Sequence, residues 1–200
     1  MSNELFSPKD ITTLVNEAAD LKTSFEADDY DTETNISGHG AKLIAGLFNL
    51  LTAGVRNINF VSAGNLSLHV LLEQLIKYYG PGANLYISTW AVKEAPARSL
   101  LKMKDSGELK DLFGVFDYRI KTIDTKGFQL VEGLFNKYTL TKNHAKVLVL
   151  NYPYFSVTIV TSANLSNNPR IEAGIISTRT STANFHMEWM KRVLNDQKIY

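Results

Sequence analysis

Polar side chains capable of acting on a phosphate group stand at the ends of two apolar runs in the last third of the sequence. His144 and Lys146 lie at the start of a predicted strand over 145–151, and Ser162 and Asn164 follow a predicted strand over 155–161. A His-x-Lys pair on a strand places both side chains on one face, because the side-chain period of a strand is two. Histidine can attack an electrophile or move a proton, whereas lysine, serine and asparagine can donate hydrogen bonds to an anion.

The elements that must position these side chains alternate between strands and helices. Apolar runs with period two, bounded by turn residues, predict strands over 58–62, 84–89, 115–123, 145–151, 155–161 and 172–178. Helical periodicity predicts helices over 41–53, 66–79, 94–104 and 182–195. This alternation predicts an α/β fold with a mixed β-sheet flanked by helices, and the 200 residues suit one domain over 1–200.

The N-terminal part, about 1–38, has a different composition. Ser7-Pro8-Lys9-Asp10 is typical of a helix start, with Ser7 as the N-cap. Residues 24–38 are acidic and lack periodicity, which predicts a mobile loop. The acidic stretch 28–33 lacks the spaced ligands and central glycine of a calcium loop.

Composition excludes several classes of function. The chain has no cysteine, so disulfides, thiolate zinc sites and cysteine nucleophiles are excluded. It shows no clustered set of His, Asp and Glu at metal-ligand spacing, so we expect neither a metal nor another cofactor. It also shows no apolar run of membrane-spanning length and no signal peptide, and we therefore expect a cytoplasmic protein that does not bind membranes.

The ordered set around His144 resembles the phospholipase D superfamily, whose pattern is His-x-Lys, four residues, Asp, then Gly-Ser-x-Asn and a downstream Glu. The chain has His144-Ala145-Lys146, four residues, Asn151, then Thr161-Ser162-Ala163-Asn164, and Glu172 eight residues later. The resemblance covers about 142–178 and implies a phospholipase D-like fold. Two positions depart from the pattern, since Asn151 stands in place of the family aspartate and Thr161 in place of the family glycine.

The resemblance also implies a metal-independent mechanism. His144 is the implied nucleophile, which forms a phosphohistidine, and Glu172 matches the glutamate that holds the histidine tautomer. Lys146, Ser162 and Asn164 are the implied ligands of the phosphoryl oxygens. The family site needs two histidines, and one-motif members supply the second from a two-fold partner. Of His39, His69, His144 and His186, only His144 lies in such a motif, so the resemblance implies a homodimer.

Charge distribution favours nucleic acid as the substrate. Residues 1–34 hold nine acidic and two basic side chains, net −7, whereas the other 166 hold 19 basic and 11 acidic, net +8. A basic body suits a polyanion. The candidate groove residues are Trp90, Arg98, Lys102, Lys121 and Lys142.

Three hypotheses therefore stand: a dimeric nuclease, a nucleic-acid-binding protein whose Asn151 marks lost activity, and a phospholipase D acting on lipids.

Overall fold

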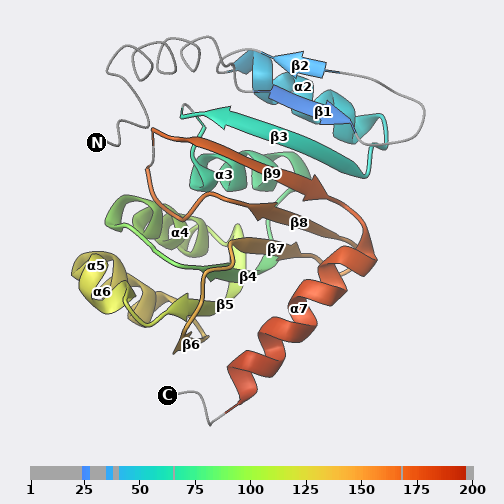
Figure 1. Ribbon diagram of the computed structural model, residues 1–200. Helices are drawn as coiled ribbons and strands as arrows, with labels where there is room; N and C mark the ends of the chain where they lie inside the picture. The colour runs from blue at the N-terminus through green and yellow to red at the C-terminus, as the bar shows by residue number, and fades with distance from the viewer. Residues whose placement is uncertain (1–23, 28–34, 38–40, 65, 168, 197–200) are drawn as a thin grey trace, which may run out of the picture.

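The protein is built on a mixed β-sheet with helices on both faces (Figure 1). The computed structural model describes residues 24–27, 35–37, 41–64, 66–167 and 169–196. The strand order is β2-β1-β3-β9-β8-β7-β4-β5-β6. The strands are β1 (Ser24–Ala27), β2 (Asn35–Ser37), β3 (Asn57–Ala63), β4 (Ala83–Thr89), β5 (Leu109–Asp117), β6 (Lys137–Thr141), β7 (Val147–Asn151), β8 (Ser156–Thr161) and β9 (Ile171–Ser177). The helices are α2 (Ala41–Thr52), α3 (Leu68–Tyr79), α4 (Glu94–Asp105), α5 (Ile120–Ile123), α6 (Thr125–Leu134) and α7 (Thr180–Asn195). The predicted α/β class with a mixed, helix-flanked sheet is confirmed.

The central strand β7 is buried on both faces, which explains its unbroken apolar run. Leu148 and Leu150 point into the larger core, which they share with α2, α3, α4 and α6. Val147 and Val149 point the other way and pack beneath α7. The two faces of one five-residue strand therefore join the two helical layers, and they fix the segment that carries His144 to the centre of the sheet.

Helix α3 shows how sequence sets the helical layer. Its buried residues recur at helical spacing: Leu68, Leu71, Leu72, Leu75 and Ile76. The helix ends at Gly80, which has φ of +92° and whose N–H donates to the carbonyl of Ile76 at 2.8 Å. Glycine adopts this left-handed backbone without the penalty that a Cβ brings, so the chain turns there toward β4.

The prediction of a mobile loop over 24–38 is wrong for the parts that the structure describes. Residues 24–27 and 35–37 form strands β1 and β2, and β1 pairs with β3. Phe25 is fully buried, and its ring lies 6.0 Å from that of Phe60. The acidic composition of this segment gave no sign that the single aromatic residue Phe25 would be buried. The predicted helix that starts at Ser7 and residues 28–34 lie outside the described residues.

The predicted strand over 115–123 is also wrong in its second half. Strand β5 begins earlier, at Leu109, and ends at Asp117, whose carboxylate accepts the backbone N–H of Arg119 at 3.0 Å. An aspartate that bonds the backbone two residues on makes a turn, so the chain leaves the sheet there. Helices α5 and α6 and strand β6 follow, and none of these three was predicted. The other predicted helices and strands are confirmed within three residues at each boundary.

Candidate active site

Six strand ends meet at one edge of the sheet and carry most of the predicted site residues. Strands β4, β5 and β6 are parallel and finish at this edge, at Thr89, Asp117 and Thr141. Antiparallel pairing brings the start of β7, the end of β8 and the start of β9 to the same edge. In open α/β sheets, ligands bind outside the carboxyl ends of the parallel strands. The His-x-Lys segment therefore lies where this architecture places binding sites.

His144 and Lys146 lie in the extended segment that leads into β7, because the strand begins at Val147 and not at 145. They also differ in environment: the imidazole of His144 is exposed, whereas Lys146 is 8% exposed. The Lys146 Nζ atom donates a hydrogen bond to the backbone carbonyl of His144 at 2.7 Å. Burial lowers the pKa of Lys146, and the charge of Glu172 acts in the opposite direction. The Lys146 ammonium is thus bonded to the backbone of the residue that carries the imidazole, His144.

The turn after β8 is fixed by its own polar side chains and by β9. The hydroxyl of Ser162 donates to the carboxylate of Glu172 and accepts the N–H of Ala173 at 3.0 Å. The hydroxyl of Thr161 donates to the carbonyl of Ala173 at 3.0 Å. Asn164 accepts a hydrogen bond from the Thr89 hydroxyl at 3.3 Å, which ties this turn to the end of β4.

These contacts place Ser162, Glu172 and Lys146 in one cluster. Glu172 bonds Ser162, and burial lowers the pKa of Lys146 while the nearby charge of Glu172 opposes that shift. The imidazole of His144 makes no hydrogen bond within the described residues; its neighbour is the ring of Trp90, with centroids 6.4 Å apart. The orienting role of Glu172 toward His144 stays a prediction.

Asn151 lies at the far end of β7 from His144. Four strand residues lie between it and Lys146, so the two positions are five residue steps, about 16 Å, apart. Its side-chain oxygen accepts the hydroxyl of Ser156 at 2.8 Å, across the hairpin between β7 and β8. An asparagine in place of an aspartate at this position therefore affects a hairpin contact and leaves the charge around Lys146 unchanged.

Asn143, which sequence reasoning missed, positions the His144 segment. It is 9% exposed, and its amide nitrogen donates to Ser88 Oγ at 3.0 Å, to the Thr89 carbonyl at 3.2 Å and to the Val115 carbonyl at 3.0 Å. Its side-chain oxygen accepts the N–H of Ala145 at 3.1 Å. Asn143 thereby fastens the chain on both sides of His144 to β4 and β5. The only sign of this role in the sequence is that Asn143 directly precedes His144.

Asp117 and Arg119 form a second support that the sequence did not assign to the site. Asp117 is 1% exposed, accepts the N–H of Asn143 at 3.1 Å and pairs with Arg119 Nε at 2.7 Å. Burial acts to raise the pKa of Asp117, but the hydrogen bonds from Arg119 and Asn143 together lower it below its usual value. The Arg119 guanidinium lies 5.2 Å from the centroid of Trp90, the same ring that contacts His144.

A pocket of about 320 Å³ opens beside His144. It is lined by Asp117, Tyr118, Arg119, Lys142, Asn143 and His144. Two of these side chains, Arg119 and Lys142, are cationic, and the one acid, Asp117, is already paired with Arg119. The pocket thus offers positive charge and an imidazole to an anionic ligand.

The structure divides the five predicted groove residues into two sets. Trp90 contacts His144, and Lys121 and Lys142 line pockets at the same edge. Arg98 and Lys102 lie on α4 and line neither of these pockets, and Arg98 pairs with Glu94 on its own helix at 2.7 Å. Only Trp90, Lys121 and Lys142 are therefore brought together with His144.

The remaining histidines lie elsewhere. His69 is in α3, where burial lowers its pKa against the opposing charge of Glu73. His186 is in α7, where it accepts the indole N–H of Trp189 at 3.0 Å. His39 lies outside the described residues.

Within the described ranges, no group of three or more acidic or histidine side chains is arranged to hold a metal ion. No helix in those ranges combines the length and apolar character that crossing a membrane requires.

Comparison with known proteins gives similarity at the level of structure. No family model matches the sequence, and neither does any curated protein. Among solved structures, a polyphosphate kinase from Porphyromonas gingivalis is similar, with a TM-score of 0.47 and 10% sequence identity. The match covers 78% of this chain and 27% of the kinase, so the chain spans about a quarter of that protein's length. At this identity the similarity concerns the arrangement of strands and helices alone.

Proposed function

We propose that the chain is a metal-independent phosphodiesterase of the phospholipase D type, acting as a nuclease through a phosphohistidine in a homodimeric site. The observation that carries this proposal is the pairing of an exposed imidazole with a buried ammonium: Lys146 bonds the backbone of His144 at the edge where Ser162 and Asn164 also lie. Positive charge held in place before the reaction stabilises the negative charge that develops on phosphoryl oxygens.

The proposed reaction proceeds in two balanced steps. A nitrogen of His144 attacks phosphorus, the bond from phosphorus to the leaving oxygen breaks, and that oxygen takes a proton from a second imidazole. Water then attacks the phosphohistidine, gives its proton to the second imidazole, and breaks the bond between nitrogen and phosphorus. Lys146 balances charge on the phosphoryl oxygens in both steps.

The second imidazole is proposed to be His144 of a two-fold partner. Within the described residues, His69 and His186 have their neighbours in α3 and α7, and the imidazole of His144 is exposed. A two-fold axis near the sheet edge that carries His144 would bring two copies of the same imidazole together.

The position of Asn151 supports the enzyme over the binding-only alternative. That alternative depended on loss of a charge next to Lys146, whereas the Asn151 side chain bonds Ser156 at the other end of the strand. The cationic pocket beside His144 supports a polyanionic substrate.

A cleavage assay in excess chelator tests the proposed function. Wild-type protein is expected to cleave single-stranded or duplex DNA or RNA without metal, and His144→Ala to lose at least about a hundred-fold in rate. His186→Gln, which keeps an acceptor for Trp189 on α7, is the matched control and is expected to retain activity. An obligatory requirement for magnesium or manganese would contradict the mechanism.

Subunit mixing tests the shared site. When wild-type and His144→Ala subunits exchange in equal amounts, about a quarter of the dimers contain two intact motifs, so activity is expected to fall to about a quarter. A fall to about half would show that each subunit works alone. A strictly monomeric and fully active protein in analytical ultracentrifugation would also rule out the shared site.

A further inference from the structure

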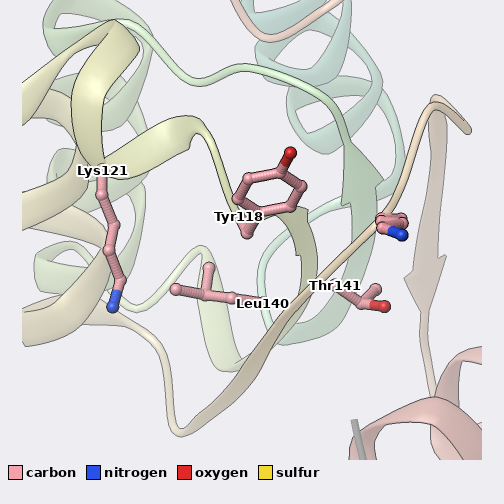
Figure 2. Close-up of a pocket in the computed structure, with 5 residues that line it drawn as sticks. Tyr118, Lys121, Leu140 and Thr141 are labelled. Atoms are coloured by element: carbon pink, nitrogen blue, oxygen red, sulfur yellow. The ribbon is translucent and has the colours of Figure 1, made fainter. Parts of the chain in front are cut away.

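A second pocket of about 390 Å³ adjoins the His144 pocket, and Tyr118 and Lys142 line both. Its remaining lining residues are Lys121, Leu140 and Thr141. In Figure 2, Lys121 extends from α5 on one side and the Thr141 side chain lies on the other, with the Tyr118 ring and Leu140 between them. The volume falls in the range of small-molecule sites.

The lining of this pocket combines a flat aromatic surface with cations. Tyr118 is 51% exposed, although it is a large aromatic side chain next to a buried aspartate. The guanidinium of Arg119 lies 5.6 Å from the Tyr118 ring centroid. Lys121, which also lines the pocket, has its Nζ atom 5.7 Å from the centroid of the Phe128 ring. An exposed ring bordered by cations suits a ligand that is itself a flat ring attached to an anion.

The pocket is held rigidly beside the nucleophile. The turn that carries Tyr118 is fixed by the hydrogen bond from its N–H to the Thr141 carbonyl at 3.0 Å. Asp117, the preceding residue, bonds both Arg119 and Asn143, and Asn143 precedes His144. A ring stacked on Tyr118 would therefore lie beside the segment that carries His144.

We propose that this pocket is a nucleobase subsite, in which the base stacks on Tyr118 while its phosphate faces Lys142 and His144. The inference rests on the proposed nuclease function and names its substrate class as single-stranded nucleic acid. A base inside a duplex is already stacked and paired, so only an unpaired base enters without disrupting the duplex. The site consequently selects single strands by the access of one base, while the sequence-independent part of the affinity comes from phosphate contacts.

Equilibrium binding to matched oligonucleotides tests the subsite, with the full chain carrying His144→Asn so that the probes stay intact. The probes are a fluorescent single-stranded oligothymidylate, an abasic strand with the same number of phosphates, and a duplex of equal length. The single strand is expected to bind roughly ten-fold more tightly than the abasic strand. Tyr118→Leu is expected to remove that difference and Tyr118→Phe to keep it. Equal affinity for the abasic strand, or a difference that survives Tyr118→Leu, would overturn the subsite, and so would a duplex that binds as tightly as the single strand.

Two further measurements separate this inference from the proposed function. Abasic-strand binding is the folding control, because Tyr118→Leu is expected to leave it unchanged. Hydrolysis of methyl p-nitrophenyl phosphate, which has no base, reports the chemistry: hydrolysis without base-dependent binding would refute the subsite and leave the phosphodiesterase standing. Base-dependent binding by a protein that hydrolyses no diester would uphold the subsite and refute the nuclease. Tyr118-dependent binding to phosphatidylcholine vesicles, with no preference among the oligonucleotides, would assign the pocket to a lipid and overturn the inference.

Discussion

Lys146 Nζ donates its hydrogen bond to the backbone carbonyl of His144 at 2.7 Å, so the buried cation of the His-x-Lys motif is tied to the chain that carries the exposed imidazole. One of its three donors is used in this way, and the remaining donors are available to other acceptors. Burial lowers the pKa of this ammonium, and the negative charge of Glu172, which accepts a hydrogen bond from Ser162, opposes that shift. Lys146 therefore links the two halves of the candidate site, the segment before β7 and the turn after β8.

Removal of this cation is expected to abolish most of the activity. Lys146→Met keeps most of the buried stem but removes the charge, and we expect a loss in kcat of about a hundred- to a thousand-fold. Lys142→Met, at an exposed position in the same loop, is the matched comparison and is expected to weaken substrate binding with a smaller effect on kcat. Steady-state kinetics measure both, and equal effects on kcat would contradict a special role for the buried ammonium.

Deprotonation of Lys146 is expected to give an alkaline limb distinct from the one that loss of the donor imidazole's proton produces, and its position is expected to depend on Glu172. Burial lowers the pKa of Lys146, so its charge is lost at a lower pH than that of an ordinary lysine, and the negative charge of Glu172 opposes this shift. Glu172→Gln removes the opposing charge, lowers the pKa of Lys146 further and should move the alkaline limb of the pH profile toward lower pH. The measurement is kcat/KM against pH for both proteins. An alkaline limb that stays in place or moves upward would show that the Lys146–Glu172 pair does not set it.

Asn143 is expected to matter for stability as well as activity. Asn143→Ala leaves the carbonyls of Thr89 and Val115 without their donor, at a cost of about 2–3 kcal/mol in the free energy of unfolding. It also frees the segment that carries His144, so kcat should fall in the folded fraction. Urea denaturation and kinetics on the same preparation check both effects. Asn195→Ala is the control, since Asn195 accepts one exposed hydrogen bond from Lys137; a similar loss of stability there would contradict the special role of Asn143.

An aspartate at position 151 is expected to change little. Asn151→Asp places a charge about 16 Å along the strand from Lys146, beyond the Debye length of physiological salt, so turnover should stay within roughly two-fold. The Ser156 hydroxyl can still donate to the new carboxylate. A large gain in activity would mean that Asn151 marks a degenerate enzyme, which is the binding-only alternative.

Sequence periodicity predicted the parts of this fold that residue types alone determine. Strand β7 and helix α3 have apolar patterns that match one structure, and both were predicted. Strand β1 was missed because the residues around it are acidic. The strand is held by the burial of one ring, Phe25, against Phe60, and this tertiary contact leaves no local pattern in the sequence. The turn after Asp117 was missed because an aspartate within an apolar run gave no sign that it would bond the backbone two residues on.

The candidate site was predicted in part for the same reason. The motif residues His144, Lys146, Ser162 and Glu172 have a fixed spacing that a sequence displays, and the structure brings them to one edge of the sheet. Asn143 and Tyr118 have no such spacing, since they reach the site through contacts between β4, β5 and the loop before β7. Arg98 was chosen by charge alone, and its partner Glu94 lies one helical turn away.

Rapid-quench trapping of the covalent intermediate tests the central claim most directly. During turnover of an oligonucleotide in chelator, the account predicts an acid-labile, base-stable phosphoryl adduct, which mass spectrometry of peptides kept at alkaline pH should place on His144. The adduct should form and decay at rates that match turnover, and it should be absent in His144→Asn, which should also be inactive. A protein that turns over with no such adduct, and whose His144→Asn variant remains active, would contradict the account.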